Sequence, residues 1–252
     1  MLTINADDLG RSAHATDRIM ECHAGNRINA ASAMVFMEDS DRAAALATAS
    51  GLDVGLHINF TESFTGFDVP PSLRMNHERI RGFLRASKYA LILYHPFLRS
   101  AFREVFAAQV NEFARLYGRV PSRFDGHQHM HLCTNMILDR LLPAGTRVRR
   151  SFSFKPGEKS FLNRYYRTLI DRRLAARHRV GDYFFILLHH LPLSRLQRVV
   201  ELARTYDVEL MTHPAVPIEW EALLSDQFEN MISQVGLAQR PEVRRQISEV
   251  RN

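Results

Sequence analysis

Short apolar segments alternate with helical segments along most of this chain, and this alternation restricts its fold more than any other feature. We predict seven strands, at residues 2–6, 31–36, 54–60, 123–125, 146–148, 183–188 and 208–211. Strands separated by helices pair in parallel, because a parallel pair needs a long crossover connection. The order of the elements therefore predicts an α/β fold. We expect an irregular (β/α) barrel of about seven mostly parallel strands, in a single domain over residues 1–252.

Most connections between the strands are predicted to be helical, with two exceptions. Helical patterns cover residues 13–23, 42–49, 100–117 and 137–142. Residues 61–97 contain Pro70 and Pro71, so we expect a long irregular excursion there. Residues 151–182 are basic and are expected to form a loop and a helix, and Pro241 is expected to open a last helix.

The composition is that of a globular, intracellular protein. The hydrophobic fraction of 46% over 252 residues is enough for a sizeable core. The sequence has no long uncharged apolar run and no signal-peptide pattern, so we expect no transmembrane segment. Two cysteines, Cys22 and Cys133, are too few for a disulfide scaffold and suit a reducing compartment. We therefore expect a cytoplasmic location.

The chain is basic, with a formal net charge of +6 and a pI of about 9.7. The excess is spread along the chain, with denser patches at residues 147–150 and 164–179. A spread excess is interpreted as a solvated surface, and no motif predicts nucleic-acid binding. A peripheral contact with an anionic membrane, an acidic substrate and a homodimer stay open as alternatives.

Polar side chains follow the carboxyl ends of several predicted strands. In β/α barrels these ends lie on one face, where the connecting loops meet and active sites form. Residues that are far apart in the sequence are therefore expected to share one pocket. The residues in these positions are Asp7, Asp8, His57, Asn59, Asp125, His127, Arg149 and His213.

Two adjacent carboxylates, Asp7 and Asp8, come directly after the first strand. One of them can bind a metal while the other takes a proton from a water molecule. The alternative is an ordinary helix N-cap, which needs only one Asp. His57 shares its side of a strand with Gly55 and Asn59, which suits a small polar pocket, although a histidine there can also be a buried core residue.

The segment 125–131 contains three histidines within five residues, and imidazole is a common metal ligand. A single metal cannot easily take all three from one strand, and a histidine-rich surface loop is the alternative interpretation. Asp125 is placed to orient an imidazole from behind. His213 follows the last strand, where a histidine can act as a general acid opposite a carboxylate base.

Four sequence blocks together resemble the YdjC-like carbohydrate deacetylases, which include chitooligosaccharide and hopanoid-biosynthesis deacetylases. The blocks are Ala6-Asp-Asp-Leu-Gly10, Gly55-Leu-His-Ile-Asn59, Asp125-Gly-His-Gln-His-Met-His131 and Glu209-Leu-Met-Thr-His-Pro214. The resemblance implies an irregular β/α barrel that hydrolyses the N-acetyl group of an amino sugar, an enzyme acting on a linear amide bond.

The resemblance also implies roles for individual residues. A divalent metal would be held by Asp8, His57 and His127, with Asp7 as general base and His213 as general acid. We assign substrate binding to Asn59, His129 and Arg149, of which Arg149 matches an arginine of the family. Zinc suits such a ligand set, and magnesium or manganese stays open. The expected partner is an N-acetylated sugar, either free or linked to a lipid or phosphate. The alternatives are a metal-dependent phosphoesterase and an inactive carbohydrate-binding protein.

Overall fold

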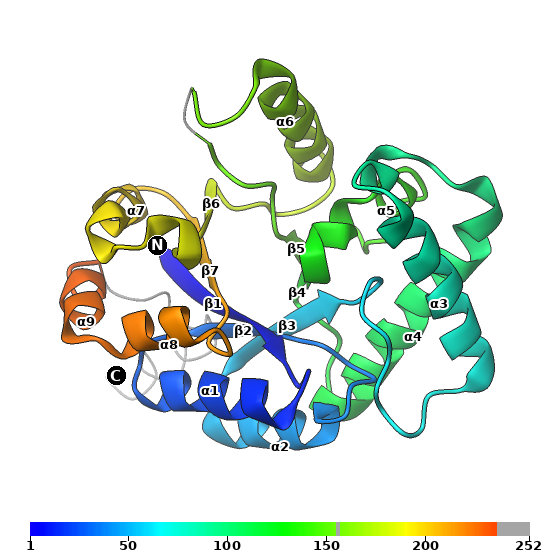
Figure 1. The fold of residues 1–252 in the computed structure, drawn as a ribbon, viewed down its shortest axis with the longest axis horizontal. Coiled ribbons are helices and arrows are strands. Elements are labelled where there is room, and N and C mark those ends of the chain that lie inside the picture. The colour runs from blue at the N-terminus through cyan, green and yellow to red at the C-terminus, as the bar shows by residue number, and fades with distance from the viewer. Residues whose placement is uncertain (155–156, 236–252) are drawn as a thin grey trace, which may run out of the picture.

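The computed structural model describes residues 1–154 and 157–235, and its element order follows the predicted one (Figure 1). All seven predicted strands are present, although several end a few residues away from the predicted positions. The strands are β1 (Leu2–Leu9), β2 (Ala30–Ala33), β3 (Asp53–Ile58), β4 (Arg123–Gly126), β5 (Arg147–Val148), β6 (Tyr183–Ile186) and β7 (Val208–Thr212).

The strands form one sheet in the order β5-β4-β3-β2-β1-β7-β6, and every neighbouring pair is parallel. The sheet curls but does not close, because β5 and β6 are its two edges. A single bridge joins Arg147 to Arg179 across this side of the barrel. The predicted α/β fold with an irregular barrel of about seven strands is therefore confirmed.

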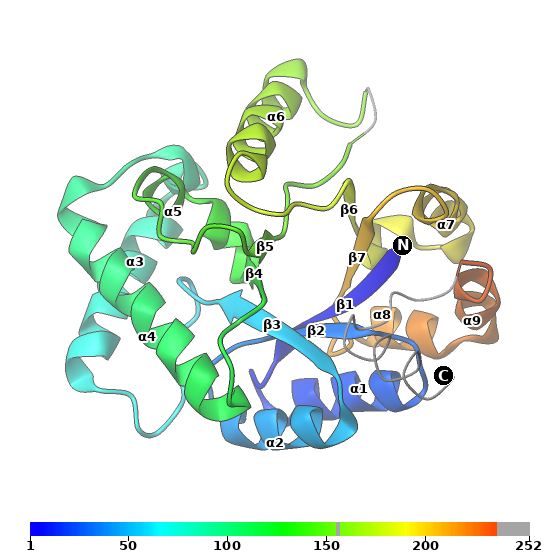
Figure 2. The ribbon, with the colours of Figure 1, turned by 180° about the vertical axis from the view of Figure 1, so that it is seen from behind.

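The helices flank the sheet, with one exception that stands apart (Figures 1 and 2). The helices are α1 (Ala13–Ala24), α2 (Ser40–Ser50), α3 (Pro71–Ala86), α4 (Arg99–Tyr117), α5 (Thr134–Leu138), α6 (Phe161–Ala175), α7 (Gln197–Ala203), α8 (Pro217–Leu224) and α9 (Asp226–Ile232). Apolar side chains from the strands and the flanking helices form one continuous hydrophobic core. The exception is α6, which lies at the margin of the molecule and has a single buried residue, Leu174.

The structure corrects one prediction and refines another. Residues 61–97 were expected to be irregular, but they contain the helix α3. Pro70 is the N-cap of α3 and Pro71 its first residue, a position that tolerates proline because the first amide has no partner inside the helix. The helix expected over 137–142 lies a few residues earlier, at α5. The loop and helix expected within 151–182 are present, with α6 as the helix.

Two further expectations concern the ends of elements and of the chain. The helix expected to begin at Pro241 lies outside the described residues. Among the residues that the structure describes, no helix has the length and apolar character needed to cross a membrane.

Candidate metal centre and active site

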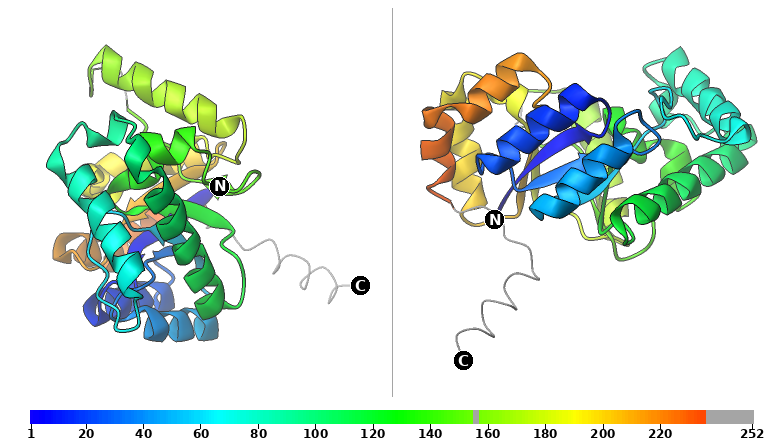
Figure 3. Two further views of the ribbon diagram at one scale, coloured as in Figure 1. Left: turned by 90° about the vertical axis from the view of Figure 1, so that its right-hand side faces the viewer. Right: turned by 90° about the horizontal axis from the view of Figure 1, so that it is seen from below.

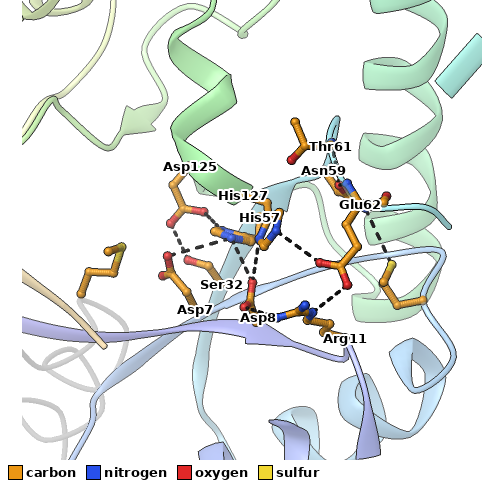
Figure 4. Close-up of polar contacts among 12 residues, drawn as sticks. Asp7, Asp8, Arg11, Ser32, His57, Asn59, Thr61, Glu62, Asp125 and His127 are labelled. Atoms are coloured by element: carbon orange, nitrogen blue, oxygen red, sulfur yellow. Dashed lines mark hydrogen bonds and ion pairs between the residues drawn. The ribbon is translucent and has the colours of Figure 1, made fainter. Parts of the chain in front are cut away.

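A bulge at the end of β1 brings two successive carboxylates to the same side. The pairing of β1 with β2 shifts register between Ala6 and Leu9. Asp8 within this bulge has φ = 70°, a left-handed conformation that a non-glycine residue adopts at some cost. In a regular strand Asp7 and Asp8 would face opposite sides of the sheet. The bulge explains how both carboxylates reach one site (Figure 4).

The three residues expected to hold a metal lie together at this bulge. Asp8, His57 and His127 offer one ligand atom each, and these atoms all lie within 4.8 Å of one another. Asp8 Oδ1 is 3.4 Å from His57 Nε2 and 3.1 Å from His127 Nδ1. Burial raises the pKa of Asp8, but its contacts with His127 and His57 outweigh burial and hold the pKa well below the usual value. The carboxylate is therefore ionised and ready to bind a cation.

Asp125 holds the far nitrogen of His57. His57 Nδ1 donates to Asp125 Oδ1 at 2.7 Å, and Ser32 Oγ donates to Asp125 Oδ2 at 2.5 Å. This arrangement directs His57 Nε2 toward Asp8, as expected for an imidazole metal ligand with a supporting carboxylate. Asp125, His57 and Asp7 also lie close together, but both carboxylates of this group are already paired with one guanidinium.

That guanidinium belongs to Arg149, whose side chain is completely buried. Its two terminal nitrogens bond both oxygens of Asp7 at 2.7 Å, and it also pairs with Asp125 at 2.9 Å and with Glu209 at 2.7 Å. Asn5 donates a further bond to Asp7 at 2.7 Å. We assigned Arg149 to substrate binding, but its geometry suits positioning of Asp7. Three carboxylates around one arginine leave an excess of negative charge, which suits a nearby cation.

The three histidines of the segment 127–131 have three different environments. His127 joins the metal cluster, whereas His131 is buried and lies 3.0 Å from the carbonyl oxygen of Arg149. Gly126 permits this turn, since a Cβ there would meet the backbone nitrogen of His131 at 2.9 Å. The ring of His129 contacts Phe152 at a centroid distance of 4.5 Å. Burial holds the pKa of His129 well below its usual value, so its ring is neutral.

Asn59 stabilises the loop after β3. Its side-chain oxygen accepts from the amides of Thr61 and Glu62, and its amide group donates to the carbonyl of Glu62 at 2.7 Å. We assigned Asn59 to substrate binding, yet it is fully buried and bonded within this loop. The loop carries Glu62, which pairs with His127 at 3.2 Å and with Arg11 at 2.9 Å. Sequence reasoning did not single out Glu62.

His213 is paired with Glu219, a carboxylate that our sequence analysis did not select. Glu219 lies in the first turn of α8 and is buried. Its Oε1 lies 3.4 Å from His213 Nδ1, and its Oε2 accepts the backbone amide of His213 at 2.9 Å. Burial lowers the pKa of His213, but the contact with Glu219 and the charge of Asp7 outweigh it and raise the pKa. These contacts therefore favour the protonated form of His213, which is the form that a general acid requires.

A polar cavity adjoins the metal cluster. It has a volume of about 360 Å³ and is lined by Arg11, Glu62 and His127 together with residues of the loop after β3 and of α3. The helix that was missing from our prediction therefore builds one wall of the site. The cavity reaches the cluster at His127, and its lining is mainly polar and charged.

Comparisons with known proteins place this geometry in context. A family model described as "YdjC-like protein" matches residues 1–246. A carbohydrate deacetylase of Xenopus laevis is 30% identical over 135 residues, which are 52% of this chain and 43% of that protein. A chitooligosaccharide deacetylase of Serratia marcescens is 30% identical over 135 residues, 52% of this chain and 51% of that one. The chain spans about half the length of the curated relatives it matches.

One solved structure is similar over nearly the whole chain. It is a protein of Enterococcus faecalis V583 named as a candidate cellobiose-phosphate cleavage protein. The TM-score is 0.66 at 18% identity, and the match covers 96% of this chain and 98% of that one. At this identity the likeness supports the fold.

Proposed function

Because this chain belongs to the family of YdjC-like proteins, we propose that it is a metal-dependent hydrolase that removes the N-acetyl group from an amino sugar. The family membership confirms the resemblance inferred from the four sequence blocks. The observation that carries the proposal is the different surroundings of two adjacent carboxylates. Asp8 faces two imidazoles, and Asp7 is held by Arg149. This division of roles suits a metal ligand beside a general base.

A divalent metal fits the residues present. One carboxylate and two imidazoles, from Asp8, His57 and His127, form a donor set that suits zinc and leaves coordination positions open. Magnesium and manganese are the alternatives to be tested. When bound there, such a metal would polarise the amide carbonyl and lower the pKa of water.

The remaining chemistry belongs to side chains of the chain itself. Asp7 would take the proton of the attacking water, with Arg149 fixing the direction of its carboxylate. His213 would donate a proton to the departing amine, and Glu219 would keep it charged and oriented. An amine leaves poorly unless it is protonated, so the acid is as necessary as the base.

The test is a panel of N-acetylated sugars, free, phosphorylated and lipid-linked, incubated with metal-loaded protein while released acetate is measured. The proposal expects acetate from at least one of them, and a large fall in acetate release after Asp7→Asn substitution. Release of phosphate without acetate would favour the phosphoesterase alternative. Binding of a sugar by metal-loaded protein without turnover of any of them would favour the inactive binding protein.

A further inference from the structure

The outer side of α6 carries an apolar stripe that nothing in the described structure covers. Its exposed fractions are 75% for Phe161, 76% for Leu162, 53% for Tyr165 and 44% for Leu169. At 3.6 residues per turn these four side chains fall within an arc of about 100°. Figures 1 and 2 show α6 apart from the flanking helices, and Figure 3 (left) shows it across one end of the molecule.

The opposite side of α6 faces the protein and is fully engaged. Asp171 accepts from Arg150 at 3.0 Å and from the amide of Ser151 at 2.8 Å. Arg167 lies over the ring of Phe154 at 5.2 Å, and Leu174 is buried. The helix is therefore held in a fixed orientation. Its apolar stripe stays exposed to solvent, and Phe161 and Tyr165 at one edge of the stripe also line a hollow with Phe152 and Phe154.

The positive charge of the chain is concentrated around this stripe. Residues 159–179 contain seven Lys and Arg residues and one Asp, a formal charge of +6, which equals that of the whole chain. The rest of the sequence is therefore neutral overall. No ion pair among the described residues involves Arg164, Arg172 or Arg173. These guanidinium groups have their charge available for an external anion.

We propose that α6 binds an anionic lipid surface, with the apolar stripe at the level of the upper acyl chains and the arginines among the head groups. An apolar face with flanking arginines is the pattern of helices that lie in a membrane interface. A symmetric dimer through the same face would bring two sets of arginines together, and their repulsion opposes it. The inference is independent of the proposed function, because it concerns a surface outside the metal cluster.

The surface also lies close to the candidate site along the chain. The segment that leads to α6 begins at Arg149, and Phe152 within it contacts the ring of His129.

The experiment is co-sedimentation of the full chain with vesicles of phosphatidylcholine, either alone or mixed with phosphatidylglycerol. We expect binding to the anionic vesicles that weakens as salt is raised. Arg172→Gln with Arg173→Gln should reduce the partition coefficient on the order of 25-fold, about fivefold for each charge. Phe161→Ser with Leu162→Ser should reduce it on the order of tenfold or more.

Phe67→Ser is the matched control, because Phe67 is 93% exposed in a turn between β3 and α3, away from α6, and its substitution should leave binding unchanged. Circular dichroism and melting of each variant show that the fold is kept. Absence of binding to anionic vesicles, or equal effects of the α6 and Phe67 substitutions, would overturn the proposal. A dimer that the Phe161 and Leu162 substitutions dissolve would instead make the stripe a contact between copies. Deacetylation of a free sugar should persist in these variants, so loss of lipid binding is separable from failure of the proposed function.

Discussion

Replacing Glu219 by Gln isolates the effect of one buried carboxylate on the candidate general acid. The change keeps the size of the side chain and an oxygen that can accept the backbone amide of His213. It removes the negative charge 3.4 Å from His213 Nδ1, where only 1% of the Glu219 side chain is exposed to solvent. The fold should therefore survive, while the pKa of His213 falls.

The size of the shift can be bounded from the geometry. Two unit charges at 3.4 Å interact by about 5 kcal/mol at an effective dielectric constant of about 20, and about 1.4 kcal/mol corresponds to one pKa unit. His213 keeps 28% of its side chain exposed, so solvent screens part of the interaction. We expect the pKa of His213 to fall by roughly one to two units.

The sign of the effect on activity follows from the role of His213 as acid. A protonated histidine is lost as pH rises through its pKa in the folded protein, so deacetylation falls on the alkaline side. With Glu219→Gln this alkaline limb of kcat should move to lower pH, whereas the acidic limb should stay. Acetate release measured across pH gives the profile, and Glu221→Gln, an exposed change on the same helix, is the control. If the alkaline limb does not shift in Glu219→Gln, Glu219 is not what raises the pKa of the general acid.

Three further predictions concern the base, the metal and the arginine. Asp7→Asn should lower kcat on the order of 100- to 10,000-fold while metal content is retained, and full activity would exclude Asp7 as base. Removal of metal by a chelator should abolish activity, and restoring it at about 100 times its Kd should stabilise the fold by about 2.7 kcal/mol. Thermal melting measures this stabilisation by the metal, which should disappear in His57→Ala. Arg149→Lys cannot bond both oxygens of Asp7, so kcat should fall on the order of 100-fold, while an unchanged KM would exclude substrate contact.

Most of the fold followed from local patterns. The seven strands are short apolar segments whose type is set by their neighbours in sequence, so they could be predicted individually. The helix α3 was missed because Pro70 and Pro71 were taken as helix breakers, although proline at the first helical position favours a start. A proline pair thus has opposite meanings at a helix end and in a helix interior, and the sequence alone did not distinguish them.

The site residues that lie in compact sequence motifs could be predicted. The residues whose position depends on contacts between distant parts of the chain could not. Asp8, His57 and His127 belong to dense blocks and lie together as expected. Glu219 carries no local signal, since a single glutamate on a helix is most often exposed. Its burial against His213 depends on the position that α8 takes after the end of β7. Arg149 was found, but its pairing with a carboxylate 142 positions away could not be read from its neighbours.

The register shift between Ala6 and Leu9 bears on how this chain's relatives should be compared. Both carboxylates reach the site only because one irregularity in the backbone turns Asp7 and Asp8 the same way. A relative that lost the bulge could keep the same two letters in an alignment and still have lost one of the two functions. Substitutions of residues that pack against the bulge could therefore abolish activity although both Asp residues are kept. The presence of the motif alone does not show that a relative is active.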